Sequence, residues 1–171
     1  MSAKLRRRPL QELIHDIDVS AALLGALTSI LNPSIYKTGK ASILKMAENP
    51  SLVAKSQGLA DLLHHWTLPF LAMSLMSNQN TLLHRDNGGA YASMDLLVSV
   101  GNYQNGWLQV PGVGFNLNYY SGTVVCLAGR VVHHGATVEG ERVGWAQYNW
   151  EDVAGLFGES EFDWVFLNNV N

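Results

Sequence analysis

The chain has 171 residues, 47% of them hydrophobic, with five Trp, six Tyr and five Phe. This length and composition suit one packed domain. We expect a single domain over residues 1–171, made of a helical support region (1–65), a β core (66–150) and a C-terminal tail (151–171). Cys126 is the only cysteine, which excludes an internal disulfide and a Cys-rich zinc site.

The net charge of -3 is unevenly distributed along the chain. Residues 1–55 hold eight of the eleven Lys and Arg and four of the fourteen Asp and Glu, a net +4, whereas residues 56–171 hold three bases and ten acids, a net -7. This balance excludes a globally basic surface for nucleic-acid binding. Any contact with a polyanion would use the N-terminal part, or Arg85 and Arg130.

The sequence carries neither a signal-peptide pattern nor a membrane-spanning run. The basic residues at positions 4–8 are followed by an amphipathic stretch rather than by an apolar one. No apolar run reaches the length of about 20 residues that a membrane helix needs. We therefore expect a soluble, intracellular protein.

The N-terminal third is predicted to be helical. Apolar residues recur at helical spacing from about residue 10 to 31, where Asn32-Pro33 ends the first helix. A second helix is expected from about residue 35 to 47. A third begins at Ser51, which is a suitable N-cap, and continues to Leu63.

The texture changes near Trp66, where short apolar runs begin to alternate with Gly, Asn and Ser turns, a pattern typical of antiparallel β-structure. Strands preceded by helices predict an α+β fold with a jelly-roll or cupin-like barrel. After Trp150 we expect a short helix over 151–157 and an aromatic segment over 162–167. The eight candidate strands are about 67–76, 78–84, 93–100, 106–110, 114–120, 123–127, 130–137 and 142–148.

A possible metal site follows from His84 and Asp86 at the end of one candidate strand. Residues two apart on a strand point to the same face, so both side chains can reach one ion, while Arg85 points the other way. A His-x-Asp pair with a distant His is the sequence form of the 2-His-1-carboxylate iron site. That site leaves coordination positions open for a cosubstrate and O₂.

The second histidine would come from His133 or His134, about fifty positions later. Adjacent strand residues face opposite sides, so only one of them should bind, and the strand parity leaves the choice open because the following turn can be counted as two or three residues. Arg142 supplies a cation suited to a cosubstrate carboxylate. If Arg142 faces inward, the small residues Gly144 and Ala146 would leave room beside it.

Several sequence blocks together resemble a known family, the fungal branch of the TET/JBP-like Fe(II)/2-oxoglutarate-dependent dioxygenases. The likeness extends over about residues 30–150 and is most specific in the blocks around the candidate ligands. These blocks are Thr81-Leu82-Leu83-His84-Arg85-Asp86-Asn87-Gly88-Gly89, Asp95-Leu96-Leu97-Val98, Ser121-Gly122-Thr123-Val124-Val125, Gly129-Arg130-Val131-Val132-His133-His134-Gly135 and Gly140-Glu141-Arg142.

The resemblance implies a double-stranded β-helix fold and a set of site residues. Iron would be held by His84, Asp86 and His134, because the family pattern at the distal ligand is His followed by Gly. The 2-oxoglutarate carboxylate would be held by Arg142. The chain departs from the commoner Arg-x-Ser ending, since Gly144 stands where a serine hydroxyl would add a hydrogen bond.

The resemblance also implies the reaction, an oxidation that uses Fe(II), 2-oxoglutarate and O₂. The expected substrate is a methylated nucleobase such as 5-methylcytosine in DNA, which would be flipped out of a duplex to be reached. Action on DNA would place the protein in the nucleus. Two alternatives stay open: the same chemistry on a protein side chain or small molecule, and a weakly active or inactive metal-binding relative, for which Gly144 is the main hint.

Overall fold

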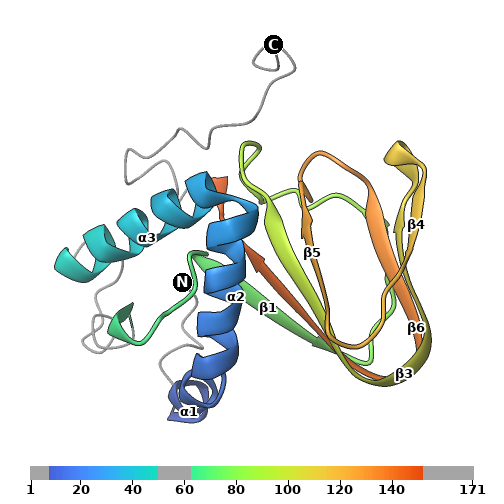
Figure 1. Cartoon of the computed structure of the whole chain (residues 1–171), viewed down its shortest axis with the longest axis horizontal. Coiled ribbons are helices and arrows are strands. Elements are labelled where there is room, and N and C mark those ends of the chain that lie inside the picture. Colours follow the sequence, from blue (N-terminus) through green and yellow to red (C-terminus); the bar gives the residue numbers. More distant parts are fainter. Residues whose placement is uncertain (1–7, 50–62, 152–171) are drawn as a thin grey trace. The chain divides into compact units, whose positions relative to one another are not determined.

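The computed structural model describes residues 8–49 and 63–151 (Figure 1). The described residues divide into two compact units, one that ends at Leu71 and one that begins at Ala72. The boundary lies six residues after the expected start of the β core at residue 66. None of the described helices is long and apolar enough to cross a membrane.

The helical unit contains α1 (Arg8–Asp16), α2 (Asp18–Leu31) and α3 (Pro33–Glu48). The single helix predicted over 10–31 is therefore two helices, separated at Ile17. The predicted break at Asn32-Pro33 is confirmed: the Asn32 side chain accepts a hydrogen bond from the Ile35 amide (3.1 Å), and Pro33 occupies the first turn of α3. The predicted third helix from Ser51, the helix over 151–157 and the segment 162–167 lie outside the described residues, apart from a helical end at residues 63–64.

The second unit is one antiparallel sheet with β1, β6, β3 and β4 side by side, in which β2 also pairs with β6 and β5 with β3. Helices followed by an antiparallel sheet confirm the predicted α+β class. The strands are β1 (Ala72–Ser77), β2 (Thr81–His84), β3 (Asp95–Val110), β4 (Phe115–Asn118), β5 (Thr123–Leu127) and β6 (His134–Tyr148), with the short 3-10 helix η3 (Pro111–Val113) between β3 and β4.

The prediction of eight strands is wrong because two pairs of them are continuous. Candidates 93–100 and 106–110 are both parts of β3, and candidates 130–137 and 142–148 are both parts of β6. Residues that usually mark turns instead bend these strands: Gly101 and Gly140 have positive φ (146° and 124°), and the β3–β6 register shifts between Gln104 and Trp107.

The two long strands organise the unit because each carries two short partners. Along β6, β2 pairs near the start of the strand and β1 along its second half. Along β3, β5 pairs with the first half and β4 with the end. The larger remaining differences from prediction are at strand starts: β1 begins at Ala72 rather than residue 67, and β2 begins at Thr81 rather than residue 78, where Asn78 has left-handed backbone (φ 51°).

Gly101 is a backbone position that should tolerate no side chain. A Cβ there would overlap the Glu141 carbonyl oxygen, and the positive φ is unfavourable for other residues. We predict that Gly101→Ala lowers the free energy of unfolding by about 1–3 kcal/mol, measured by urea denaturation. Gly112→Ala is the control, since nothing lies within 4 Å of a Cβ at Gly112. Equal stability of the two variants would contradict the prediction.

Candidate functional site

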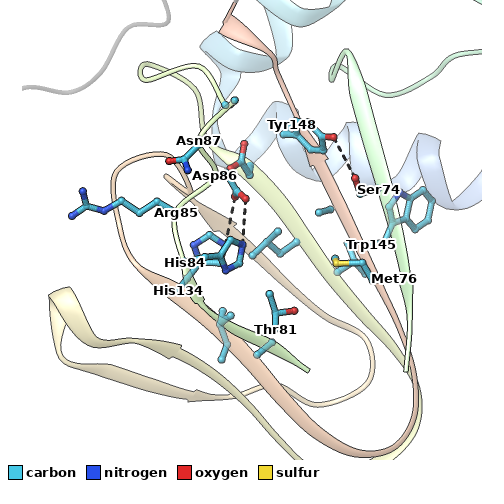
Figure 2. A pocket seen from close by; sticks show the side chains of 18 of the residues that line it. Ser74, Met76, Thr81, His84, Arg85, Asp86, Asn87, His134, Trp145 and Tyr148 are labelled. Carbon is cyan, nitrogen blue, oxygen red and sulfur yellow. Dashed lines mark hydrogen bonds and ion pairs between the residues drawn. The ribbon is translucent and has the colours of Figure 1, made fainter. Parts of the chain in front are cut away.

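The β unit contains a cavity of about 280 Å³, shown in Figure 2. Its walls come from β1, β2, β3 and β6 and from the loop that follows β2. The cavity is lined by all four site residues predicted from the sequence: His84, Asp86, His134 and Arg142. Residues separated by about sixty positions in the chain are thus brought to one site.

His84, Asp86 and His134 form a cluster in which one potential ligand atom from each side chain lies within 4.8 Å of the others. The His84 Nε2 atom is 3.4 Å from Asp86 Oδ1, and the His134 Nε2 atom is 3.5 Å from Asp86 Oδ2. In Figure 2 both imidazoles point toward Asp86, while the Arg85 side chain points away from it. This is the donor set of a 2-His-1-carboxylate iron site.

The strand pairing explains why these three side chains meet. His84 of β2 and His134 of β6 are directly opposite partners, so their side chains lie on one face with ring centroids 4.5 Å apart. The Asp86 amide donates to the Gly129 carbonyl (3.0 Å), which holds the residue after β2 against the loop before β6. Gly129 has no Cβ, and one placed there would overlap the Asp86 carboxylate.

Both imidazoles are held in the tautomer that a metal ligand needs. The Nδ1 atom of each ring lies near the carbonyl oxygen two residues earlier, Leu82 for His84 (2.8 Å) and Val132 for His134 (3.2 Å). A carbonyl only accepts, so each Nδ1 carries a proton, and each Nε2 atom is left on the side of Asp86, where a metal ion can bind it. Burial lowers the pKa of His134, against the opposing effects of the Val132 carbonyl and Asp86. This favours the neutral imidazole that binds metals.

Arg142 is a buried cation on another wall of the cavity, with 4% of its surface exposed. Its Nε donates to Ser99 Oγ (2.8 Å), one terminal nitrogen donates to the Gln79 carbonyl (3.3 Å), and Cζ lies 5.2 Å from the centre of the Tyr119 ring. Among the described residues, no carboxylate lies within 4 Å of the guanidinium. A buried cation without an anionic partner is suited to an anionic ligand.

A family model described as the oxygenase domain of the 2OGFeDO superfamily, Tet_JBP, matches residues 3–153. The chain belongs to the Tet/JBP family. A solved structure of NgTET1 in complex with 5mC DNA has the same fold, with a TM-score of 0.64 and 15% sequence identity over 90% of this chain and 56% of that chain. This chain thus spans little more than half the length of that relative. No curated protein matches it.

The shared fold confirms the expected jelly-roll core, and the matched family model describes an oxygenase domain of the superfamily that uses Fe(II), 2-oxoglutarate and O₂. The residues present fit these groups. Two imidazole nitrogens and a carboxylate converge from one side of the cavity, and a buried guanidinium faces it from another. The sequence had already singled out these four side chains.

His133 lies outside the cluster in this Tet/JBP domain. It is exposed and precedes β6, which begins at His134. The strand-parity question therefore does not arise, because only one of the two histidines is in the strand. Whether His134 binds iron stays a prediction, and it now has a clear test.

We predict that His134→Ala weakens Fe(II) binding by more than about a hundredfold, because a ligand should matter more than the outer partners whose loss costs 10–100-fold. The matched variant His133→Ala should bind Fe(II) like the wild-type protein. Anaerobic titration with Fe(II), or with Co(II) followed by absorption, measures both. Loss of binding in His133→Ala alone would show that the assignment is reversed.

Asp95, at the start of β3, is a residue of the site that the sequence reasoning missed. It is buried (4% exposed), lines the cavity and lies beside Asp86, since a Cβ on Gly129 would overlap both carboxylates. Burial and then the charge of Asp86 raise the pKa of Asp95 to about 8. In the sequence, Asp95 stood only at the start of a family block, Asp95-Leu96-Leu97-Val98. Its spacing to the candidate ligands gave no signal that it would lie beside Asp86.

The raised pKa of Asp95 predicts a pH-dependent stability of the metal-free protein. Folding raises this pKa above its unfolded value near 3.8, so the folded state binds more protons between about pH 4 and pH 8. The contribution of Asp95 is therefore favourable at the acidic end and is lost as pH rises through that window. The slope is on the order of 1 kcal/mol for each pH unit.

Urea denaturation at pH 5 and pH 7.5 measures this effect as a difference between variants. Asp95→Asn should reduce the loss of stability between the two pH values. Asp16→Asn, which changes an exposed aspartate on α1, is the control and should keep the wild-type slope. The same slope in Asp95→Asn and the wild-type protein would refute a role for Asp95 in the pH dependence.

Proposed function

We propose that this chain oxidises the methyl group of a methylated nucleobase, such as 5-methylcytosine in DNA, with Fe(II) held by His84, Asp86 and His134 and 2-oxoglutarate held through Arg142. The observation that carries the proposal is the presence, in one cavity, of a convergent His-Asp-His cluster and a buried arginine without an anionic partner among the described residues. A cation that lines the same cavity as the metal ligands suits a cosubstrate that binds at both ends.

Each residue has a defined part in this reaction. Bound Fe(II), with 2-oxoglutarate and O₂, supplies the oxidation of a C–H bond, while 2-oxoglutarate becomes succinate and CO₂. The two imidazoles and Asp86 would hold the metal, since this donor set leaves coordination positions free for the cosubstrate and O₂. Arg142 orients the cosubstrate by its distal carboxylate. Apolar walls such as Leu97, Leu108 and Ala146 limit access of water to the reacting centre.

The edge of the cavity supports a nucleobase as the substrate. Arg85 and Trp150 line the edge, and Trp150 is half exposed, with its ring against Tyr148 (5.4 Å between centroids). Nearby, the Arg130 guanidinium stacks over the exposed Tyr91 ring at 4.4 Å. Exposed aromatic faces and arginine planes are the groups on which unpaired bases stack, and both arginines can contact phosphates.

The solved NgTET1 structure holds 5mC DNA, which agrees with this substrate class. We also infer from the sequence blocks around the candidate ligands that the chain belongs to the fungal branch of the family. An enzyme that oxidises 5-methylcytosine would act in the nucleus and take part in DNA demethylation.

The proposed function predicts two results that can be measured in order. Anaerobic addition of Fe(II) and 2-oxoglutarate should produce a visible charge-transfer absorption band. Addition of O₂ and a 5-methylcytosine oligonucleotide should then release succinate and yield oxidised cytosine, measured by mass spectrometry. The unmethylated oligonucleotide is the matched control and should remain unchanged.

Two other outcomes would overturn parts of the proposal. Failure to form the band would contradict an Fe(II)/2-oxoglutarate site. A band with succinate release but no change in the oligonucleotide would contradict the nucleobase, and would indicate a protein side chain or a small molecule as the substrate.

A further inference from the structure

The space beside Gly144 is filled by the side chain of Arg142. A Cβ on Gly144 would lie 3.0–3.2 Å from the three outer atoms of the guanidinium, Cζ and both terminal nitrogens. The two residues lie on the same face of β6, two positions apart, so the guanidinium folds back over the glycine. The room that the sequence suggested beside Arg142 is therefore filled by the guanidinium, which would have to shift by a few tenths of an ångström to admit a Cβ at 144.

A hydroxyl group reaches Arg142 from the neighbouring strand instead. Ser99 of β3 is the register partner of Gly144, is fully buried (0% exposed), and accepts a hydrogen bond from Arg142 Nε (2.8 Å). Ser99 Oγ also lies 2.6 Å from the Tyr103 hydroxyl, and Tyr103 in turn donates to the Tyr119 carbonyl (2.8 Å).

The directions of these hydrogen bonds are fixed by the two groups at the ends of the hydrogen-bonded row, Arg142 and the Tyr119 carbonyl. The guanidinium can only donate and the Tyr119 carbonyl can only accept. Tyr103 uses its proton on Tyr119, so Ser99 must donate to Tyr103 and accept from Arg142. The hydroxyls of Ser99 and Tyr103 thus each have one donor and one acceptor partner, and an acceptor lone pair of Ser99 is held toward Arg142.

We propose that Ser99 is a positioning residue for 2-oxoglutarate, which orients Arg142 from β3 and so replaces the hydroxyl that Gly144 lacks. The inference rests on the proposed function, in which Arg142 holds the distal carboxylate of the cosubstrate. It assigns the departure from Arg-x-Ser a physical reason: glycine at 144 makes room for the guanidinium, and the hydroxyl is supplied across the strand pair.

The remaining donors of Arg142 suit a carboxylate. Arginine has five N–H groups, of which one bonds Ser99 and one bonds the Gln79 carbonyl within the described part of the chain. The N–H groups left on the two terminal nitrogens can donate to a carboxylate in the paired, parallel geometry that arginine favours. The Tyr119 ring, 5.2 Å from Cζ, limits movement of the guanidinium plane.

The test is a 2-oxoglutarate titration of the anaerobic Fe(II) protein, followed by the absorption band. Ser99→Ala should raise the 2-oxoglutarate concentration at half-saturation by about tenfold or more, the usual effect of losing a hydrogen bond to a charged group. Its affinity for Fe(II) alone should not change. Tyr103→Phe should give a smaller change of the same sign, and Arg142→Ala should give the largest.

The variant Gly144→Ser distinguishes this inference from the alternative, in which Gly144 merely deprives 2-oxoglutarate of a hydroxyl partner. If Ser99 has taken over the role, adding a serine at 144 should weaken 2-oxoglutarate binding, because its Cβ displaces the guanidinium. Tighter binding in Gly144→Ser would overturn the inference, as would unchanged half-saturation in Ser99→Ala.

Ser93→Ala controls for the loss of a buried serine. Ser93 is 2% exposed and accepts a hydrogen bond from the Asn149 side chain (3.2 Å) away from Arg142. Ser93→Ala should lower stability without changing the 2-oxoglutarate concentration at half-saturation. An equal rise of that concentration in Ser93→Ala and Ser99→Ala would overturn the inference. A wild-type protein that forms no band would overturn the proposed function, and this inference with it, whereas a wild-type band with an unaffected Ser99→Ala overturns the inference alone.

Discussion

The pairing of β3 with β6 is the constraint on which the rest of the site depends. The two strands share one register from Leu96 opposite Gln147 to Gly101 opposite Arg142, and continue beyond the bend. This register puts Ser99 opposite Gly144 and so sets the position of the Arg142 guanidinium. A slip of one residue would turn every one of these side chains to the other face of the sheet.

The metal cluster depends on the same long strand from its other end. β6 begins at His134, opposite His84 of β2, and carries Arg142 eight residues later. One strand therefore supplies both the distal histidine and the cation, and its bend near Gly140 helps to fix the distance between them. Both groups need rigid support, since a metal ligand and a carboxylate anchor lose affinity when their geometry loosens.

The electrostatics of the cavity divide between its two sides. Burial favours the neutral form of His134, and burial together with the charge of Asp86 raises the pKa of Asp95, so the metal-ligand side limits its charge in the absence of an ion. The other side keeps a full positive charge on Arg142, surrounded by a serine, a carbonyl and an aromatic ring. This asymmetry suits a cation at one end of the cavity and a carboxylate at the other.

The sequence alone predicted the chemistry of the site, because the order and spacing of His84, Asp86, two adjacent histidines and Arg142 match a 2-His-1-carboxylate iron site followed by a cosubstrate cation. It also determined the α+β class through its change of periodicity near Trp66. Only the tertiary structure decided which candidate strands are continuous, since Gly101 and Gly140 bend a strand as readily as they end it. It alone placed His134 in the strand opposite His84 and His133 before that strand, a choice that the family pattern had only implied, and it brought Asp95 and Ser99 to the site. These contacts arise from register between distant strands, which local sequence does not encode.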